Sequence, residues 1–118
     1  MRKVLARKYQ TNKRETYKAT FVRFGKRSNY KYGDKKTILL ENVVDNRGFL
    51  VADHLWMDCG KQFDKIGLRK GDKFRFDARV KIYVKGYEKD RFDYGLSYPS
   101  KIFKLSLPYV IKNVILEN

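Results

Sequence analysis

The sequence predicts one small, mainly β domain, and three observations support this fold class. At 118 residues the chain is long enough for one compact core but not for two. Apolar and polar residues alternate over several segments of strand length, a period of two that is typical of strands with one buried face. Turn-forming residues separate these segments. We expect residues 14–118 to form the domain and residues 1–13, which lack a clear apolar period, to form a basic arm that either orders only on binding or is a solvated tail that aids solubility.

Four of the expected strands, residues 15–24, 36–45, 49–57 and 73–85, follow from the distribution of apolar residues. In the last of them, KFRFDARVKIYVK, apolar residues alternate mainly with cations, which predicts one dry face and one cationic face. The sequence DNRG at residues 45–48 suits a hairpin, because asparagine tolerates unusual backbone angles and glycine supplies a positive φ. The second and third strands therefore fold back on each other.

A short helix of about two turns is expected between the third and fourth strands. Phe63 and Ile66 share a face of this helix, and Gly67 suits the left-handed residue just beyond its end. A fifth strand is expected within residues 100–118, either around Ile102 or over residues 110–116, with the intervening proline marking a break or an edge.

The expected order of three strands, a short helix and two further strands is that of the OB-fold, a five-stranded, partly open Greek-key barrel. An SH3-like barrel lacks the helix between strands three and four, and an immunoglobulin-like sandwich has more strands. We therefore predict an OB-fold-like barrel. In this fold oligonucleotides bind across strands two and three, between the loop that joins strands one and two and the loop that joins strands four and five.

The two expected loops at this face, residues 25–36 and 85–101, are both basic and aromatic. Cations neutralise phosphates, whereas rings stack on unpaired bases with roughly 1–3 kcal/mol per base. A duplex hides the faces of its bases, so such a cleft favours single strands. Tyrosines in long loops also serve to cover the ends of a barrel, and this second role stays open. The candidate nucleic-acid contacts are Lys26, Arg27, Tyr30, Lys31 and Tyr32 in the first loop and Lys85, Tyr87, Arg91, Phe92, Tyr94, Tyr98 and Lys101 in the second.

Further candidate contacts lie on the strands: Arg23, His54, Trp56, Arg79 and Tyr83. His54 and Trp56 are two residues apart and therefore share a face of the third strand. Trp56 is either a stacking platform at the centre of the site or a core residue, which is the commoner role for the single tryptophan of a small barrel. Both placements stay open, because Leu55 and Met57 on the opposite face compete as the buried set.

The charge of the chain indicates a polyanionic partner. The 28 Lys and Arg residues against 13 Asp and Glu give a net charge of +15, an excess that opposes compaction unless a polyanion compensates it. We expect single-stranded nucleic acid as the partner, with DNA favoured over RNA, although no residue specifies a contact to a 2′-hydroxyl. The alternative is a protein-interaction module whose aromatic anchors dock onto an acidic protein or onto a nucleoprotein complex of replication or defence.

The sequence contains no pattern typical of an enzyme. Asp53 and His54 are neighbours in a strand and point to opposite faces, so they cannot form a dyad. Acidic residues at positions 88, 90 and 93 alternate with cations, which favours surface ion pairs over a metal site. The single Cys59 allows neither a disulfide nor a cysteine metal cluster, so we expect no cofactor. We expect a cytoplasmic protein that binds no membrane, because the chain lacks both a signal-peptide core and an apolar run of about 20 residues.

The run LRKGDKFRFDARVKIYVKGY at residues 68–87, with DHLW before it and DYGLSYPSKI after it, resembles a group of small, mostly uncharacterised proteins. Phages, plasmids and other mobile elements of Gram-positive bacteria carry these proteins, and the resemblance covers about the last two-thirds of the chain. It implies an OB-like domain and a role in element replication or in the inhibition of a host defence complex. It supplies no active-site residues.

Overall fold

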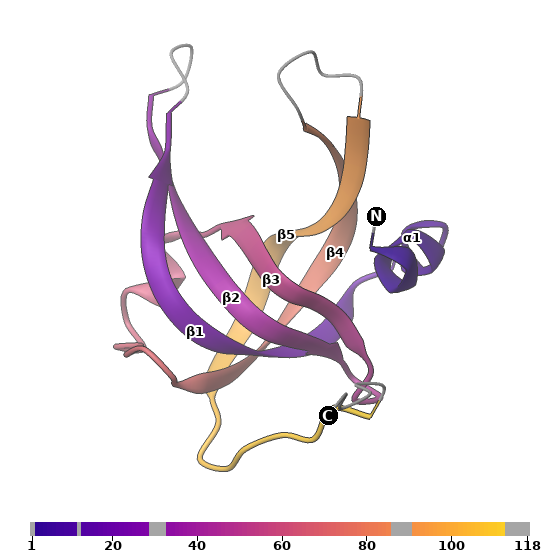
Figure 1. Ribbon diagram of the computed structural model, residues 1–118. Coiled ribbons are helices and arrows are strands. Elements are labelled where there is room, and N and C mark those ends of the chain that lie inside the picture. Colours follow the sequence, from indigo (N-terminus) through magenta and orange to yellow (C-terminus); the bar gives the residue numbers. More distant parts are fainter. Residues whose placement is uncertain (1, 12, 29–32, 86–90, 113–118) are drawn as a thin grey trace, which may run out of the picture.

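The computed structural model describes residues 2–11, 13–28, 33–85 and 91–112 of the chain, with the main chain alone at 84, 85, 91 and 92. In this part of the chain five antiparallel strands form one curved sheet in the order β3-β2-β1-β4-β5 (Figure 1). The strands are β1 (Glu15–Arg27), β2 (Lys35–Asp45), β3 (Leu50–Asp58), β4 (Lys73–Lys85) and β5 (Arg91–Lys104). The prediction of a mainly β chain is confirmed.

The β1–β2 and β4–β5 hairpins rise from the same end of the sheet as two arms (Figure 1). The first four expected strands agree closely with β1 to β4, and the hairpin at residues 45–48 is also confirmed. Gly48 has a φ of +88°, and one carboxylate oxygen of Asp45 accepts hydrogen bonds from the backbone N–H groups of Arg47 and Phe49, both 2.9 Å long. This carboxylate therefore closes the turn between β2 and β3.

The expected loop over residues 85–101 is wrong from residue 91 onward, because β5 begins there and pairs with β4. In that ladder Tyr94 lies opposite Ile82 and Leu96 opposite Val80, so this stretch has a strand period of two that its charges, glycine and proline obscured. The first expected loop is likewise shorter, since β1 and β2 cover both of its ends. Ile102 lies in β5 as expected, whereas residues 110–112 form no strand and residues 113–116 lie outside the described residues.

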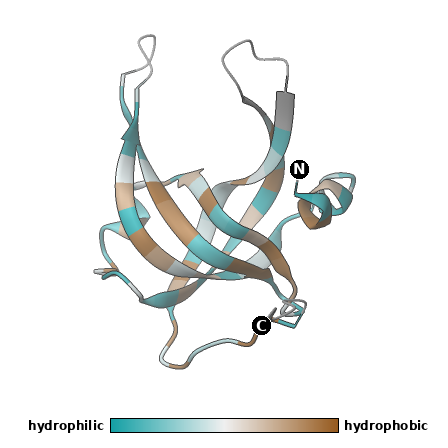
Figure 2. Ribbon diagram, viewed as in Figure 1, coloured by the Kyte–Doolittle hydropathy of each residue, from teal (hydrophilic) through white to brown (hydrophobic). Residues whose placement is uncertain are grey.

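The core lies on the concave side of the sheet and decides the orientation of β3. Val51, Leu55 and Met57 of β3 are buried, while His54 and Trp56 on the other face are exposed. The strands accordingly show alternating apolar and polar bands (Figure 2). The largest fully buried side chains include Tyr17, Ile38, Leu40, Phe63, Phe74 and Phe76.

The N-terminal segment differs from the expected disordered arm, because residues of α1 (Lys3–Tyr9) form a helix packed on the sheet. Leu5 is fully buried and belongs to the core. Between β3 and β4 the expected two-turn helix is only a single 3-10 turn, η1 (Lys61–Phe63). Its Phe63 nevertheless enters the core and meets Phe74 edge to face, with ring centroids 5.9 Å apart, and Gly67 has the expected positive φ of 61°.

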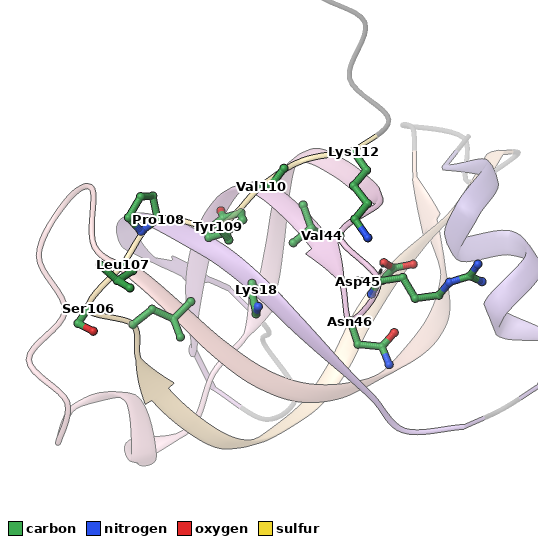
Figure 3. Close-up of a pocket in the computed structure, with 13 residues that line it drawn as sticks. Lys18, Val44, Asp45, Asn46, Ser106, Leu107, Pro108, Tyr109, Val110 and Lys112 are labelled. Carbon is green, nitrogen blue, oxygen red and sulfur yellow. Dashed lines mark hydrogen bonds between the residues drawn. The ribbon is translucent and has the colours of Figure 1, made fainter.

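Residues 105–112 follow β5 and run across β1 and β2 as an extended segment (Figure 3). The Tyr109 hydroxyl shares a hydrogen bond of 2.9 Å with the Thr20 hydroxyl and donates to the Asn42 carbonyl at 2.9 Å. The backbone N–H of Lys112 donates to the Gly48 carbonyl at 2.8 Å. Together with Lys18 and the β2–β3 turn, this segment lines a pocket of about 520 Å³ (Figure 3). No helix in the described part of the chain has the length and apolar content needed to cross a membrane.

Candidate nucleic-acid interface

A pocket of about 260 Å³ receives side chains or backbone from all five strands, and we call it the cleft. Its principal residues are Arg27 of β1, Thr37 of β2, Trp56 of β3, Lys81 and Tyr83 of β4, and Gly95 of β5. The cleft lies where the two edge strands, β3 and β5, approach each other below the two arms. Three candidates that are far apart in sequence, Arg27, Trp56 and Tyr83, thereby come together.

Trp56 lies on the outer face of β3, which excludes the core placement. Its side chain is 45% exposed, and its ring covers Gly25 of β1. A Cβ atom at Gly25 would lie only 2.7 Å from Cζ3 of the indole, so only glycine lets the ring approach this closely. The Arg23 guanidinium carbon lies 4.9 Å from the ring centroid, a cation–π contact that also steadies the indole. The chain therefore presents a fixed, half-exposed indole.

Tyr83 holds a similar position on the other side of the cleft, above Gly95 of β5. A Cβ atom at Gly95 would lie 3.3 Å from Cε1 of the tyrosine ring, a tight contact that glycine avoids. The Tyr83 hydroxyl accepts a hydrogen bond of 3.1 Å from Arg2 Nη1. The cleft is thus bordered by two rings, each resting on a strand glycine and each fixed by an arginine.

Arg2 connects three strands at this point. Its Nη1 donates to the Tyr94 carbonyl of β5 and its Nη2 donates to the His54 carbonyl of β3, both at 2.9 Å. The Arg2 backbone N–H also donates to an Asp93 carboxylate oxygen at 2.9 Å. In the described residues β3 and β5 are the two edges of the sheet, so Arg2 bridges backbone carbonyls of both edge strands.

The electrostatics of the cleft are positive. Arg27 makes a two-pronged ion pair with Asp58, with Nη2 2.8 Å from Oδ2 and Nε 3.3 Å from Oδ1. Lys81 has no carboxylate partner among the residues that the structure describes. Because the Asp58 carboxylate is already shared with Arg27, the free ammonium of Lys81 and the guanidinium of Arg23 are available to an anion.

A second pocket of about 410 Å³ continues the cleft, because both pockets share Asp58 and Lys81. Tyr98, with 74% of its side chain exposed, and Lys35 line this continuation. Cys59 also lines it, but burial raises the pKa of its thiol to about 11 despite the nearby Lys36 ammonium. The thiol is therefore protonated at neutral pH and is a poor nucleophile.

The other described candidates lie outside the cleft. The Tyr94 ring packs on Tyr9 of α1, with centroids 5.5 Å apart, and His54 lies 3.7 Å from the Glu41 carboxylate and lines a pocket beside α1. Lys26 pairs with Asp34 at 3.4 Å. Arg79 and Lys101 are exposed and do not line the cleft. Of Lys85, Arg91 and Phe92 only the main chain is described, and Tyr30, Lys31, Tyr32 and Tyr87 lie outside the described residues.

Among the residues of this site that sequence reasoning missed, four have specific roles: Arg2, Gly25, Lys81 and Gly95. The strand period could have identified Lys81, because it lies between Arg79 and Tyr83 on one face of β4. No local signal predicts the other three, since their roles depend on contacts between distant strands. In the described part of the chain no group of three His, Cys, Asp or Glu residues is placed to hold a metal ion.

Comparison of the chain with protein-family models, with curated proteins and with solved structures gave no match.

Proposed function

We propose that the chain is a non-catalytic OB-fold-like protein that binds single-stranded nucleic acid in the cleft, with DNA favoured over RNA. The strand order supports the OB-like barrel, because β1 pairs with both β2 and β4, and only a β3–β5 pairing is needed to close the sheet. The resemblance of residues 68–87 to proteins of mobile elements suggests a replication accessory of such an element.

The observation that carries the proposal is the pair of rings across the cleft. Trp56 and Tyr83 each lie over a glycine, so their positions are fixed before a ligand arrives. A fixed ring loses little conformational freedom when a base stacks on it, and base stacking is nearly independent of base identity. Lys81 lines the same pocket, has no carboxylate partner among the described residues and supplies a cation for a phosphate. A single strand offers both partners, whereas a duplex offers only the phosphates.

The experiment that tests the proposal is fluorescence anisotropy with labelled single-stranded and duplex oligonucleotides, in DNA and RNA forms, at several salt concentrations. We expect preference for the single strand and an affinity that falls linearly on a logarithmic scale with salt. Equal and weak binding of single strands and duplexes would contradict a stacking cleft. It would favour the alternative of a protein partner, for which Phe103, Leu107 and Val110, exposed by 54%, 75% and 74%, supply an apolar surface.

A matched pair of variants separates stacking from general aromatic content. Trp56→Ala should weaken single-strand binding by roughly 1–3 kcal/mol, the typical value of one base stack, and Trp56→Phe should restore part of the loss. Phe103→Ala is the control, because Phe103 is an exposed ring beneath a cation, Arg75 at 5.2 Å, but does not line the cleft. Equal losses for the Trp56→Ala and Phe103→Ala variants would mean that the cleft is not the binding site.

A further inference from the structure

A groove runs along α1 from the cleft to the β2–β3 turn. It consists of two adjoining pockets, of about 380 and 400 Å³, which share Val4. The first pocket lies between the start of α1 and residues 50–54, and the second lies between Arg7 and Phe49. We call these two pockets the helix groove. α1 lies beside the sheet on the side of β3 and β4 (Figure 1).

The helix groove continues the cleft through Arg2. Arg2 lines the first pocket of the groove, and the same side chain donates a hydrogen bond to Tyr83 of the cleft. The neighbouring His54 lines the groove and lies two residues before Trp56 on the same face of β3. A single strand of nucleic acid that leaves the cleft along β3 therefore enters the helix groove.

The charge of the helix groove suits a polyanion. Lys3, Arg7 and Arg47 are exposed along it, and among the described residues neither Lys3 nor Arg7 has an ion-pair partner. Two carboxylates also line the groove. Asp45 is buried and already pairs with Lys8 at 3.2 Å, which leaves Asp53 as the exposed one. The three exposed cations thus outweigh it.

The far end of the groove repeats the chemistry of the cleft. The Arg47 guanidinium carbon lies 5.5 Å from the centroid of the Phe49 ring, as Arg23 lies over Trp56. Phe49 precedes β3 and Trp56 follows seven positions later, a stretch of chain that spans at most about 23 Å at roughly 3.3 Å per residue. One stacked strand covers this length with about seven nucleotides at roughly 3.4 Å each. An extended strand covers it with fewer.

We propose that the helix groove binds the continuation of the single strand held in the cleft, so that the protein contacts a strand longer than the cleft alone accommodates. This inference rests on the proposed function of the cleft. It assigns phosphate contacts to Lys3, Arg7 and Arg47 and a stacking position to Phe49, none of which belongs to the two loops, residues 25–36 and 85–101, that the sequence predicts to flank the cleft. DNA and RNA strands share this chemistry, and the test includes both.

The test compares two triple variants that lose the same charge. The groove variant combines Lys3→Gln, Arg7→Gln and Arg47→Gln. The control variant combines Lys65→Gln, Arg69→Gln and Lys70→Gln, exposed cations between η1 and β4 that line neither the cleft nor the groove. Anisotropy is measured with oligothymidylates and oligouridylates of about 4 and about 12 nucleotides, both within the range of about 4–16 nucleotides that one OB-fold covers. Thermal unfolding of both variants verifies that they are folded.

We expect the groove variant to bind the short oligonucleotides like the control variant but the longer ones with a weaker salt dependence. Three lost phosphate contacts, at about 0.7 each for a single strand, lower the slope of log affinity against log salt by about 2. The affinity ratio of control to groove variant should then change roughly 18-fold between about 50 and 200 mM salt.

The outcomes separate this inference from the proposed function. Equal slopes for both folded variants with the longer oligonucleotides, together with clear binding of single strands, would overturn the helix groove and leave the cleft intact. An equal loss with short and long oligonucleotides would also overturn it, because the cations would then act within the cleft. Failure of every oligonucleotide to bind the unmodified chain would overturn both proposals.

Discussion

Replacing Leu5 by Ala should destabilise the whole domain, because Leu5 fastens α1 to the sheet. Its side chain is 0% exposed and is the only buried residue of α1. It packs in the same cluster as Phe74 and Phe76 of β4. A helix of seven residues has little stability in isolation, so its order depends on this packing. Loss of this contact therefore destabilises both the helix and the sheet.

The magnitude follows from the burial. The substitution removes three carbon atoms from a dry site, worth about 2.4 kcal/mol at roughly 0.8 kcal/mol per methylene group. The cavity left behind raises the measured range for Leu→Ala to about 2.7–5 kcal/mol. If α1 detaches from the sheet in the Leu5→Ala variant, no cavity forms. The loss of stability is then limited to the free energy with which α1 docks on the sheet. We therefore expect a loss of about 2–4 kcal/mol in the free energy of unfolding for Leu5→Ala.

Urea unfolding followed by circular dichroism and by the fluorescence of the single tryptophan measures this loss. At a slope of about 2 kcal/mol per M urea, the midpoint should fall by roughly 1–2 M. Lys3→Ala is the matched control, since Lys3 lies on the same helix but is exposed, and its effect should stay within about 0.5 kcal/mol. A loss below about 0.5 kcal/mol for Leu5→Ala would refute the reasoning. Residues 1–13 would then behave as the disordered arm that the sequence suggests.

Two further predictions concern the site and the pH dependence. Gly25→Ala should push the Trp56 ring off β1, because the new Cβ would lie 2.7 Å from Cζ3 of the indole. The fluorescence emission of this single tryptophan should then shift to longer wavelength, and the affinity for single-stranded nucleic acid should fall. Gly60→Ala, where a Cβ meets open space, should change neither, and an unchanged emission for Gly25→Ala would contradict the contact. For Asp45, burial disfavours the charge, but backbone hydrogen bonds and the Lys8 ammonium lower its pKa below the ordinary 3.8. The ionised carboxylate therefore stabilises the fold above that pH, and this contribution is lost as the pH falls through the folded pKa. Urea midpoints measured between pH 7 and pH 3 should fall less in Asp45→Asn than in the unmodified chain; parallel curves would contradict this assignment.

Much of the sheet was predictable because strand signals are local. The alternation in residues 73–85 gave β4 with its observed bounds, and DNRG gave the β2–β3 turn that Asp45 closes. The start of β5 was missed, because the charges, glycine and proline of residues 91–101 indicate a loop unless the partner strand is known. α1 was missed for a similar reason. A seven-residue helix with one buried side chain, Leu5, produces no detectable period.

The candidate site was predictable only in part. The loop composition indicated aromatic and basic residues, yet Tyr94 packs against α1 while Tyr83 reaches the cleft. The two tyrosines belong to neighbouring strands of the same hairpin, and composition does not distinguish them. The position of α1 distinguishes the two tyrosines. Tyr9 of α1 packs on the Tyr94 ring, and Arg2, just before α1, donates a hydrogen bond to the Tyr83 hydroxyl.

The sequence by itself determined the strands, the turn between β2 and β3 and the large positive charge, because each depends on residues close together in the chain or on composition alone. Only the tertiary structure decided that Trp56 faces outward and lies on Gly25. It also decided that Arg2 joins β3, β4 and β5, and that Tyr83 and Trp56 border one pocket. These contacts unite strands distant in sequence, and period-two alternation leaves the choice of buried face to the packing of the whole sheet.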